Sequence, residues 1–471
     1  IDELSYIDKN IEMSNRVNSK YYRNPKKILY DKKKKRFLTG LLRKVITLLE
    51  KNNIEYNIED KTNYIKELDI DLKTFEPYPG YNLWSHQILC IEHILENNRC
   101  IVQMPTGAGK SLSLATLIKH YPTANVIVTS PSTSITKSNQ KTIETIIGEK
   151  VGIAGGGKRD YQRVTSCNVD TLYRDVQKNS KLLDHIDILI VDECHTLGNT
   201  KKNKLVYENV NNAFMKVGMS ATAWRESGDD LYTEGCLGPK SFEIKEEDLQ
   251  DKGILVNFDF YSIITKDKKI KYPNYLGNGN YDTHNNKPNR DDVYYEMIVN
   301  NTERNNSIVE ICKEYYKKGC PNGPALILSE SIEHSELLHN NLIKFLKDGE
   351  EVEYVKGSDN NKKRLDVIER LSNKELKFVV STRIFNVGVN FPALGLLIIA
   401  SGGNASSRII QQLGRVVRSS TGKEKAIVVD FKDLEKYYLY YNYLNRKKAV
   451  NSHYPKTLIQ EVSVDKVLNS F

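Results

Sequence analysis

Short apolar runs alternate with longer amphipathic segments through most of this chain, in two separate stretches. In the first stretch the apolar runs are residues 100–104, 125–129, 186–191 and 217–219, and segments of helical periodicity lie at 111–120 and 138–147. Short apolar runs joined by helices are typical of a parallel β-sheet with crossover helices. The pattern therefore predicts an α/β domain over residues 79–245.

The second stretch repeats this alternation. Its apolar runs are residues 325–329, 352–355, 378–381, 396–401 and 426–431, with helical periodicity at 334–346 and 362–371. The same reasoning predicts a second α/β domain over residues 300–432.

Three further segments flank these domains. Residues 1–78 are expected to form a separate N-terminal accessory domain, with an amphipathic helix at 40–52. Residues 246–299 are expected to be a connector, because 266–290 is rich in Lys, Asn, Gly, Pro and Tyr and carries no period. Residues 433–471 are expected to be a C-terminal helical tail with a tyrosine-rich helix.

Composition excludes several classes of protein. At 39% hydrophobic and 27% charged residues, the 471-residue chain is unlike disordered or fibrous sequences. Its longest apolar runs are far shorter than the ~20 residues that span a bilayer, and it opens with no signal-peptide pattern. The seven cysteines include no C-x-x-C pair, which favours reduced thiols over a zinc site or disulfides. A cytoplasmic protein is expected, in the host cytoplasm if the source is a phage.

Positive charge is concentrated near the N-terminus. The chain carries a net charge of +9, and residues 20–51 alone hold twelve basic residues against two acidic ones. The densest part is Lys32, Lys33, Lys34, Lys35 and Arg36. A short basic segment on a nearly neutral body predicts a polyanionic partner, with nucleic acid favoured over an anionic membrane.

A glycine-containing segment lies between the first apolar run and the helix after it: Thr106, Gly107, Ala108, Gly109, Lys110 and Ser111. Glycines let backbone N–H groups converge on phosphate oxygens, a lysine can reach the β- and γ-phosphates, and a hydroxyl can ligate Mg²⁺. The segment is therefore predicted to bind ATP. Met104 stands where the strict phosphate-loop pattern has its first glycine, and the alternative is a glycine-rich turn that binds nothing.

An acidic pair follows the apolar run 186–191. A carboxylate at the end of a strand can hold the water shell of Mg²⁺, and its neighbour can orient an attacking water. We therefore predict that Asp192, with Ser111, holds the metal and that Glu193 activates water. The alternative is an acidic strand-to-loop turn.

These segments resemble the motifs of superfamily 2 helicases of the DExH class, over about residues 80–430. The acidic motif reads Asp192-Glu193-Cys194-His195, and Ser220-Ala221-Thr222 resembles motif III. The resemblance implies two tandem RecA-like domains with ATP in the cleft between them. It also implies that Gln87 reads adenine and that His195, Ser220 and Thr222 couple hydrolysis to the nucleic acid.

The second domain carries two more segments like those of the family. Residues 411–418 (Gln-Gln-Leu-Gly-Arg-Val-Val-Arg) match motif VI, Q-x-x-G-R-x-x-R. This implies that Gln411 serves the ATP site and that Arg415 and Arg418 are arginine fingers on the γ-phosphoryl group. Residues 382–392 resemble motif V, which implies a nucleotide contact at Gly388, although Asn390 replaces an aspartate common in relatives. The alternative for the arginines is a basic helix face.

The family's mechanism and strand contacts follow from the same likeness. Arg415 and Arg418 would complete the site only when the cleft is closed, so each cycle would change the grip on the strand and move the protein along it. The candidate strand contacts lie in loops at strand ends: Pro131, Ser132, Thr165, Asn168 and Thr382, with Ser329 a weaker one. Each Ser, Thr or Asn is equally suited to cap a loop. Relatives with this core act as monomers.

Two features resemble the phage UvsW and cellular RecG type of helicase. One is Arg225 with Gly238-Pro239 beyond it, and the other is the run 36–42 followed by 58–60. Relatives with this layout track 3′→5′ on DNA and remodel forks and four-way (Holliday-type) junctions in replication, recombination or repair. DNA is therefore the expected partner, with the basic segment gripping duplex.

Three alternatives remain open. DExH motifs also serve RNA helicases and transcript-release factors, although no KH or RRM signature is present. A non-unwinding duplex translocase of a restriction or defence complex would carry the same motifs, usually beside a nuclease that is not recognisable here. A nucleic-acid-binding protein with an inactive ATPase is disfavoured by intact Lys110, Asp192, Glu193 and Arg418.

Overall fold

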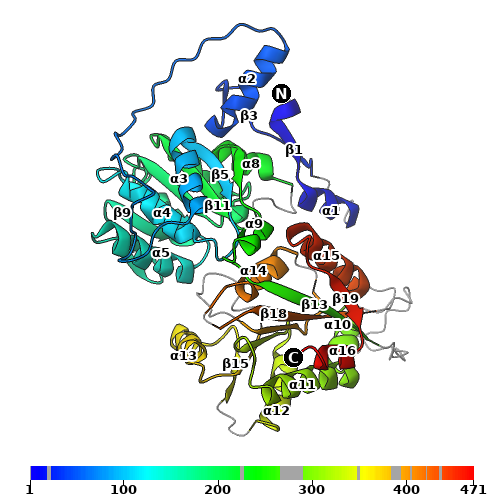
Figure 1. The fold of residues 1–471 in the computed structure, drawn as a ribbon. Helices are drawn as coiled ribbons and strands as arrows, with labels where there is room; N and C mark the ends of the chain where they lie inside the picture. Colours follow the sequence, from blue (N-terminus) through cyan, green and yellow to red (C-terminus); the bar gives the residue numbers. More distant parts are fainter. Residues whose placement is uncertain are drawn as a thin grey trace. The chain divides into compact units, whose positions relative to one another are not determined.

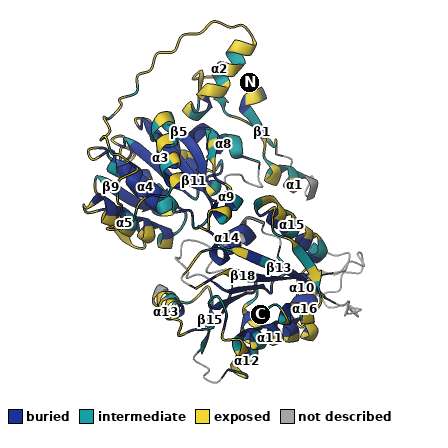
Figure 2. Cartoon of the chain, in the orientation of Figure 1, coloured by how far each residue is buried: buried dark blue, intermediate teal, exposed yellow. Residues whose placement is uncertain are grey.

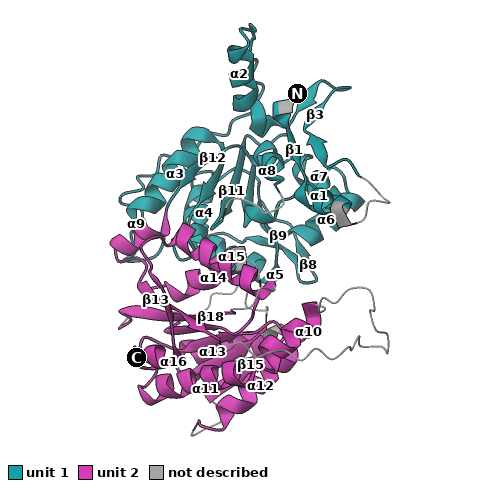
Figure 3. Ribbon diagram, turned by 90° about the vertical axis from the view of Figure 1, so that its right-hand side faces the viewer, with its two compact units in different colours: residues 1–244, 387–389 teal, residues 245–386, 390–471 magenta. Residues whose placement is uncertain are grey.

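The computed structural model describes residues 2–17, 23–222, 228–265, 290–346, 351–382, 394–403, 406–420, 422–433 and 438–471 (Figure 1). They divide into two compact units, one of described residues up to Ile244 and one of those from Lys245 onward (Figure 3). No described helix is long and apolar enough to cross a membrane. All seven cysteines are buried free thiols.

The first unit is built on an eight-stranded sheet with the order β12-β5-β11-β10-β6-β9-β7-β8. All neighbouring strands are parallel except β7 and β8, which are antiparallel. The strands are β5 (Arg99–Gln103), β6 (Val126–Ser130), β7 (Gly152–Gly155), β8 (Lys158–Asp160), β9 (Val164–Asn168), β10 (Ile188–Asp192), β11 (Met215–Ser220) and β12 (Lys240–Glu243). The helices are α3 (Ser85–Asn97), α4 (Lys110–Lys119), α5 (Thr133–Ile147), α6 (Val169–Lys178), η4 (Cys194–Thr196), α7 (Lys201–Tyr207) and α8 (Asp230–Leu237).

The second unit has a seven-stranded, wholly parallel sheet with the order β15-β16-β14-β17-β18-β13-β19. Its strands are β13 (Asn257–Ile264), β14 (Ala325–Leu328), β15 (Val352–Val355), β16 (Phe378–Ser381), β17 (Leu396–Ile399), β18 (Lys425–Lys432) and β19 (Ile459–Val462). Its helices are α9 (Glu246–Asp251), α10 (Arg290–Tyr294), η5 (Tyr295–Val299), α11 (Thr302–Lys317), α12 (Ile332–Ile343), α13 (Asn361–Ser372), α14 (Ser406–Val416), α15 (Tyr438–His453) and α16 (Val464–Leu468).

The two parallel-sheet domains confirm the predicted fold class. Parallel strands are covered by helices on both faces, so their residues are mostly apolar and lie buried, as the central strands in Figure 2 show. The connector and the helical tail each contribute a strand, because β13 comes from residues 246–299 and β19 from 433–471. Both strands extend the second sheet beyond β18. Residues 266–289, which make up nearly all of the aperiodic segment 266–290 of the connector, lie outside the described residues.

The N-terminal region is small and docks on the first unit. It contains η1 (Asp2–Leu4), β1 (Ser5–Ile7), α1 (Lys9–Val17), β2 (Lys26–Ile28), β3 (Tyr30–Asp31), β4 (Arg36–Phe37), η3 (Thr39–Leu41) and α2 (Leu42–Lys51). Leu41 is 1% exposed, and Leu38 lies against α8. A Cβ on Gly235 of α8 would lie 2.7 Å from Leu38 Cδ1, and one on Gly40 would lie 2.0 Å from Glu234 O. The missing side chains of both glycines therefore allow this close packing.

Candidate active site

The carboxyl ends of five adjacent strands in the first unit meet at one edge of the sheet. In the order β5-β11-β10-β6-β9, this edge presents the glycine loop 104–109, Ser220–Thr222, Asp192–His195, Ser130–Ser132 and Asn168. Parallel register pairs Gln103 with Ser220 and Asp192 with Met219. The sheet thus brings together segments that are far apart in sequence, at the edge where ligands bind in open α/β sheets.

The glycine loop joins β5 to α4. Gly107 and Gly109 have φ of 93° and 83°, a left-handed conformation that favours glycine, and Gly109 is the N-cap residue of α4. A Cβ on Gly109 would lie 2.0 Å from Gln87 Nε2, so a larger residue there would displace the Gln87 side chain. The loop therefore ends at the amino terminus of a ten-residue helix, where backbone N–H groups and the helix dipole favour an anion.

Lys110 folds back over this loop. Its Nζ donates hydrogen bonds to Met104 O at 3.0 Å and to Pro105 O at 3.2 Å. Met104 itself is fully buried, and its backbone N–H donates to Ser220 O on the next strand. A methionine can therefore stand at the position of the first glycine of the strict motif. Its side chain packs in the core, and its carbonyl oxygen accepts the hydrogen bond from Lys110.

A side chain that the sequence did not predict connects the glycine loop to the acidic motif. Asn139, on α5, is 1% exposed and lies between Ser111 and Asp192. Ser111 Oγ donates to Asn139 Oδ1 at 3.3 Å, and Asn139 Nδ2 donates to Asp192 Oδ2 at 2.8 Å. One amide thus fixes both groups expected to hold the metal. No local motif marks Asn139, so only the fold could reveal it.

The two carboxylates of the acidic motif have opposite pKa shifts. Burial, reinforced by the negative charge of Glu193, raises the pKa of Asp192 to about 6, against the hydrogen bond from Asn139 and the charge of Lys110. Burial also opposes ionisation of Glu193, but its hydrogen bond with His195 and the charge of Lys110 lower its pKa overall. A buried carboxylate with a raised pKa gains from a cation beside it, and oxygen ligands suit Mg²⁺. The donor set of Asp192 and Ser111 therefore fits this metal.

The acidic motif and the motif III segment meet through His195. Its Nδ1 lies 2.8 Å from Ser220 Oγ and 3.2 Å from Glu193 Oε2, and Ser220 Oγ also accepts from Thr222 N at 3.1 Å. Glu193 has a φ of 56°, the left-handed region that non-glycine residues rarely occupy. The structure therefore brings together Glu193, His195, Ser220 and Thr222.

Two family models match the chain. One, described as "Type III restriction enzyme, res subunit", matches residues 80–225, and the other, "Helicase conserved C-terminal domain", matches residues 306–420. The chain belongs to the superfamily 2 helicases. It is accordingly an ATP-dependent nucleic-acid helicase, and the two matches fall on the first and second units respectively.

Similar proteins come from a virus, a phage and a yeast. The helicase is 26% identical over 407 residues to Putative helicase 22 of Sulfolobus islandicus filamentous virus, covering 81% of this chain and 68% of that protein. It is 23% identical over 415 residues to ATP-dependent DNA helicase uvsW of Enterobacteria phage T4, covering 83% and 77% respectively. S. cerevisiae Dbp5 bound to RNA and ADP BeF3 has the same fold, with a TM-score of 0.58 at 14% identity over 83% of this chain and 93% of that one.

Gln87 lies against the glycine loop of the helicase. Its Nε2 donates to Ala108 O at 3.2 Å, its Oε1 accepts from Trp84 N at 2.9 Å, and the side chain is fully buried. His86 contacts the same carbonyl oxygen at 2.9 Å. Both ends of the Gln87 amide are therefore engaged by protein in this structure, so recognition of adenine would require these bonds to be exchanged.

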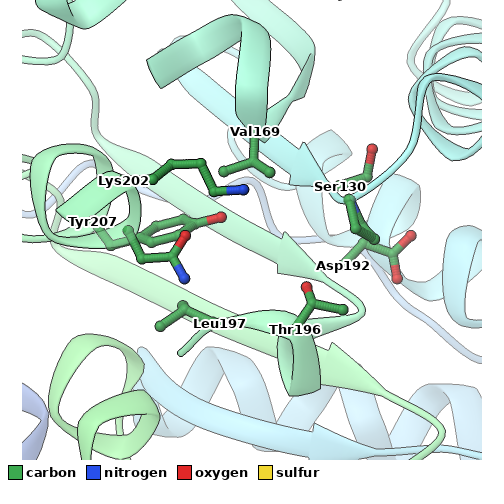
Figure 4. Close-up of a pocket in the computed structure, with 9 residues that line it drawn as sticks. Ser130, Val169, Asp192, Thr196, Leu197, Lys202 and Tyr207 are labelled. Carbon is green, nitrogen blue, oxygen red and sulfur yellow. The ribbon is translucent and has the colours of Figure 1, made fainter. Parts of the chain in front are cut away.

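A small pocket opens beside Asp192 (Figure 4). It has a volume of about 70 Å³ and is lined by Ser130, Pro131, Val169, Asp192, Thr196, Leu197, Lys202, Asn203 and Tyr207. Lys202 and Tyr207 lie on one side and Ser130 and Asp192 on the other. The pocket is therefore lined both by Asp192, the expected metal ligand, and by Pro131, an expected contact with the nucleic-acid strand.

Two of the other expected contacts with the nucleic-acid strand, Ser132 and Asn168, serve as helix caps. Ser132 Oγ accepts from Ile135 N at 3.3 Å, and Asn168 Oδ1 accepts from Asp170 N at 3.1 Å. Thr382 follows the carboxyl end of β16. Loops at this end of a β-strand are where the resemblance implies contacts with the nucleic acid. Thr165 is fully buried near the amino end of β9 and bonds to Gln162 N and O. This placement, remote from the carboxyl edge, argues against a strand contact by Thr165.

The expected motif VI residues lie on and beside α14. Arg415 is in the helix and 5% exposed, Arg418 follows its last turn, and Gln411 is part of the helix backbone. The Lys423 ammonium donates to Val416 O and to Arg418 O, which holds the end of α14. The expected contacts at Gly388, Asn390 and Arg225 lie outside the described residues.

The basic segment forms a tight hairpin. Strands β3 and β4 pair through Tyr30 with Phe37 and Asp31 with Arg36, so residues 32–35 are four consecutive exposed lysines in one turn. Asp31 Oδ1 accepts from Lys33 N at 3.0 Å and Lys34 N at 3.1 Å, bonds that hold the turn closed. We name residues 32–36 the lysine turn. Its like charges repel one another, so a polyanion would relieve them.

Proposed function

We propose that this helicase is a DNA motor that moves 3′→5′ and unwinds or branch-migrates forked and four-way DNA. The similarity to a protein named as a DNA helicase of phage T4 supports DNA as the substrate. The direction and the junction substrate rest on the resemblance of the chain's layout to the phage UvsW and cellular RecG type. The proposal includes a cytoplasmic, monomeric enzyme that uses ATP with Mg²⁺.

Each residue at the sheet edge has a proposed role in hydrolysis. Lys110 contacts the β- and γ-phosphates, Ser111 and Asp192 hold Mg²⁺, and Glu193 orients water. The loop residues Thr106 to Gly109 cradle the phosphates, and His195, Ser220 and Thr222 pass the change at the γ-phosphate to the strand. For Gln411, Arg415 and Arg418 the proposed role is in ATP hydrolysis, with the two arginines acting on the γ-phosphoryl group, and for Gly388 it is a contact with the nucleotide.

The observation that carries the junction proposal is the attachment of the lysine turn to the first unit. The segment directly after the turn packs on α8 through Leu38, Gly40 and Leu41. The turn is therefore fixed on the first unit and is not joined to it by a flexible linker. A fixed cationic projection of this kind suits a second DNA arm beside the strand in the motor. Phosphate neutralisation by lysines also makes binding dependent on salt.

ATPase stimulation tests the proposal. Single-stranded, duplex, forked and four-way DNA and matched RNA are compared, and branched DNA with a 3′ single-stranded arm is expected to stimulate most. Neutralising Lys32 to Lys35 with glutamine is expected to weaken binding of branched DNA and flatten its salt dependence, with basal ATPase within twofold of wild type. Stronger stimulation by RNA would refute the choice of DNA, and an unchanged salt slope would refute the role of the lysine turn.

A non-unwinding duplex translocase is a second candidate. The observation that favours it is the match of residues 80–225 to a model described for a restriction enzyme subunit. Displacement of a third strand from a DNA triplex without separation of a fork would identify this activity. Separation of the fork would exclude it.

A further inference from the structure

The segment that leads into α14 is held by groups from elsewhere in the second unit. After β17 the chain passes through Ala400, Ser401, Gly402 and Gly403, and α14 begins at Ser406. We name residues 400–403 the entry loop. Helix α14 begins three residues after this loop and packs against α15, and Arg415 lies on α14.

Arg446, on α15, holds the last residue of the entry loop. Its side chain is 1% exposed, and its Nη1 donates to Gly403 O at 2.8 Å. Its Nε and Nη2 donate to the two carboxylate oxygens of Asp430 on β18, each at 2.9 Å. A bidentate pair fixes the plane of the guanidinium group, and the third nitrogen is thereby aimed at the loop carbonyl.

One turn earlier on α15, Asn442 holds the neighbouring residue. Asn442 Nδ2 donates to Gly402 O at 2.7 Å in a buried position. A Cβ on Gly402 would lie 2.6 Å from Leu439 Cδ2, so the loop packs directly on this helix. Two consecutive carbonyl oxygens of the entry loop are therefore fixed by one face of α15.

The first residue of the entry loop, Ala400, is also held by a buried arginine. Arg304, on α11, donates from Nη2 to Ala400 O at 3.1 Å and from Nη1 to Asp433 Oδ1 at 2.8 Å. Two buried arginines, each paired with an acid at the end of β18, thus grip the two ends of the entry loop. This arrangement fixes a backbone position firmly, because rotation of either guanidinium would break an ion pair in a buried site.

We propose that α15 is a positioning element of the ATPase, in which Arg446 and Asn442 set the place of α14 and hence of Arg415. The inference rests on the proposed role of Arg415 as an arginine finger. The C-terminal segment, expected from sequence to be a helical tail, then acts on the rate of hydrolysis through α14. Small misplacements of catalytic groups can cost about a hundredfold in rate.

Steady-state ATPase of Arg446→Lys and Asn442→Leu in the full chain tests this inference. A lysine keeps the charge at position 446 but cannot bond both Asp430 and Gly403 O in the same geometry. We expect kcat at saturating ATP and DNA to fall about 10- to 100-fold, with the Kd for ADP within twofold of wild type. Wild-type kcat in both variants would overturn the inference.

Tyr443→Phe is the matched control. Tyr443 lies on the same helix with 1% exposure, but its hydroxyl donates to Glu461 Oε1 and accepts from Ser262 Oγ, away from the entry loop. It is expected to lower the Tm and keep kcat within twofold. An equal loss of kcat in Tyr443→Phe would mean that α15 matters only for stability, which would also overturn the inference.

A double variant separates this inference from the proposed function. If Arg446 acts through Arg415, then Arg446→Lys lowers kcat in the wild-type background but has little further effect beside Arg415→Ala. Additive losses would refute the positioning role while leaving the finger in place. Full activity in Arg415→Ala alone would refute the finger, and the inference would fail with it.

Discussion

Asn139 is the residue whose replacement best probes the geometry of the ATP site. Asn139→Leu keeps the side chain near its original size but removes the donor to Asp192 Oδ2 and the acceptor for Ser111 Oγ. A hydrogen bond to a charged group contributes about 1.5–3 kcal/mol, and each 1.4 kcal/mol is about a tenfold change. Loss of such a partner behind a metal ligand typically costs 10- to 100-fold. Both estimates predict that kcat/KM for MgATP falls about 10- to 100-fold.

The assay compares hydrolysis with nucleotide binding. The Kd for ADP measured without Mg²⁺ is expected to stay within twofold of wild type, because the glycine loop is unchanged. Gln140→Leu is the control, since Gln140 lies on the same helix and donates to Val151 O at 2.9 Å, away from the acidic motif. A kcat/KM for Asn139→Leu within twofold of the control would refute the role of Asn139.

The same variant has a pH signature. With the pKa of Asp192 at about 6, kcat/KM of the wild type should fall as the pH is lowered through about 6, because the protonated carboxyl cannot hold Mg²⁺. The hydrogen bond from Asn139 favours the ionised form, so its removal raises this pKa. The acid limb of Asn139→Leu should therefore move to higher pH, and an unmoved limb would contradict the electrostatic reasoning.

Two further outcomes follow from single residues. Lys110→Ala and Glu193→Gln should abolish ATP hydrolysis while DNA binding, measured by fluorescence anisotropy, stays within about threefold of wild type; normal turnover in Glu193→Gln would exclude water activation by this group. Burial, with the nearby charge of Arg304, lowers the pKa of His334 to about 3, and Nε2 lies 2.8 Å from Asn305 Oδ1. The unfolded chain therefore binds the extra proton between pH 6.5 and 3, so this residue should lower the unfolding free energy by about 1.4 kcal/mol per pH unit as the pH falls through that range. Denaturation of His334→Gln should show a shallower acid slope, and an equal slope would mean that His334 is not neutral in the fold.

Much of the fold was predictable because most parallel strands that are buried on both faces are rich in apolar residues. The strand β10, Ile-Leu-Ile-Val-Asp, is predictable from its run of four apolar residues. In contrast, β9 is Val-Thr-Ser-Cys-Asn, whose polar side chains find hydrogen bonds inside the unit, as Ser166 Oγ does with Thr136 O. Its burial depends on partners that are distant in sequence, so no local pattern predicts this strand.

Some residues of the site could likewise be predicted from the sequence, and others could not. Lys110, Asp192 and Ser220 could be named from sequence because each sits in a short motif whose spacing carries chemistry. Asn139 and Arg446 could not, since each acts through atoms that only the fold brings near. The run 36–42 resembles a segment of the phage UvsW type of helicase, and in the structure it docks the N-terminal region on α8.

The proposed activity is tested most directly by strand separation of a labelled DNA fork with a 3′ single-stranded arm, beside an RNA fork of the same sequence. We predict ATP-dependent separation of the DNA fork, slower or absent separation of the RNA fork, and none with Glu193→Gln. Hydrolysis of ATP without separation of the DNA fork, or faster separation of the RNA fork, would contradict the proposal.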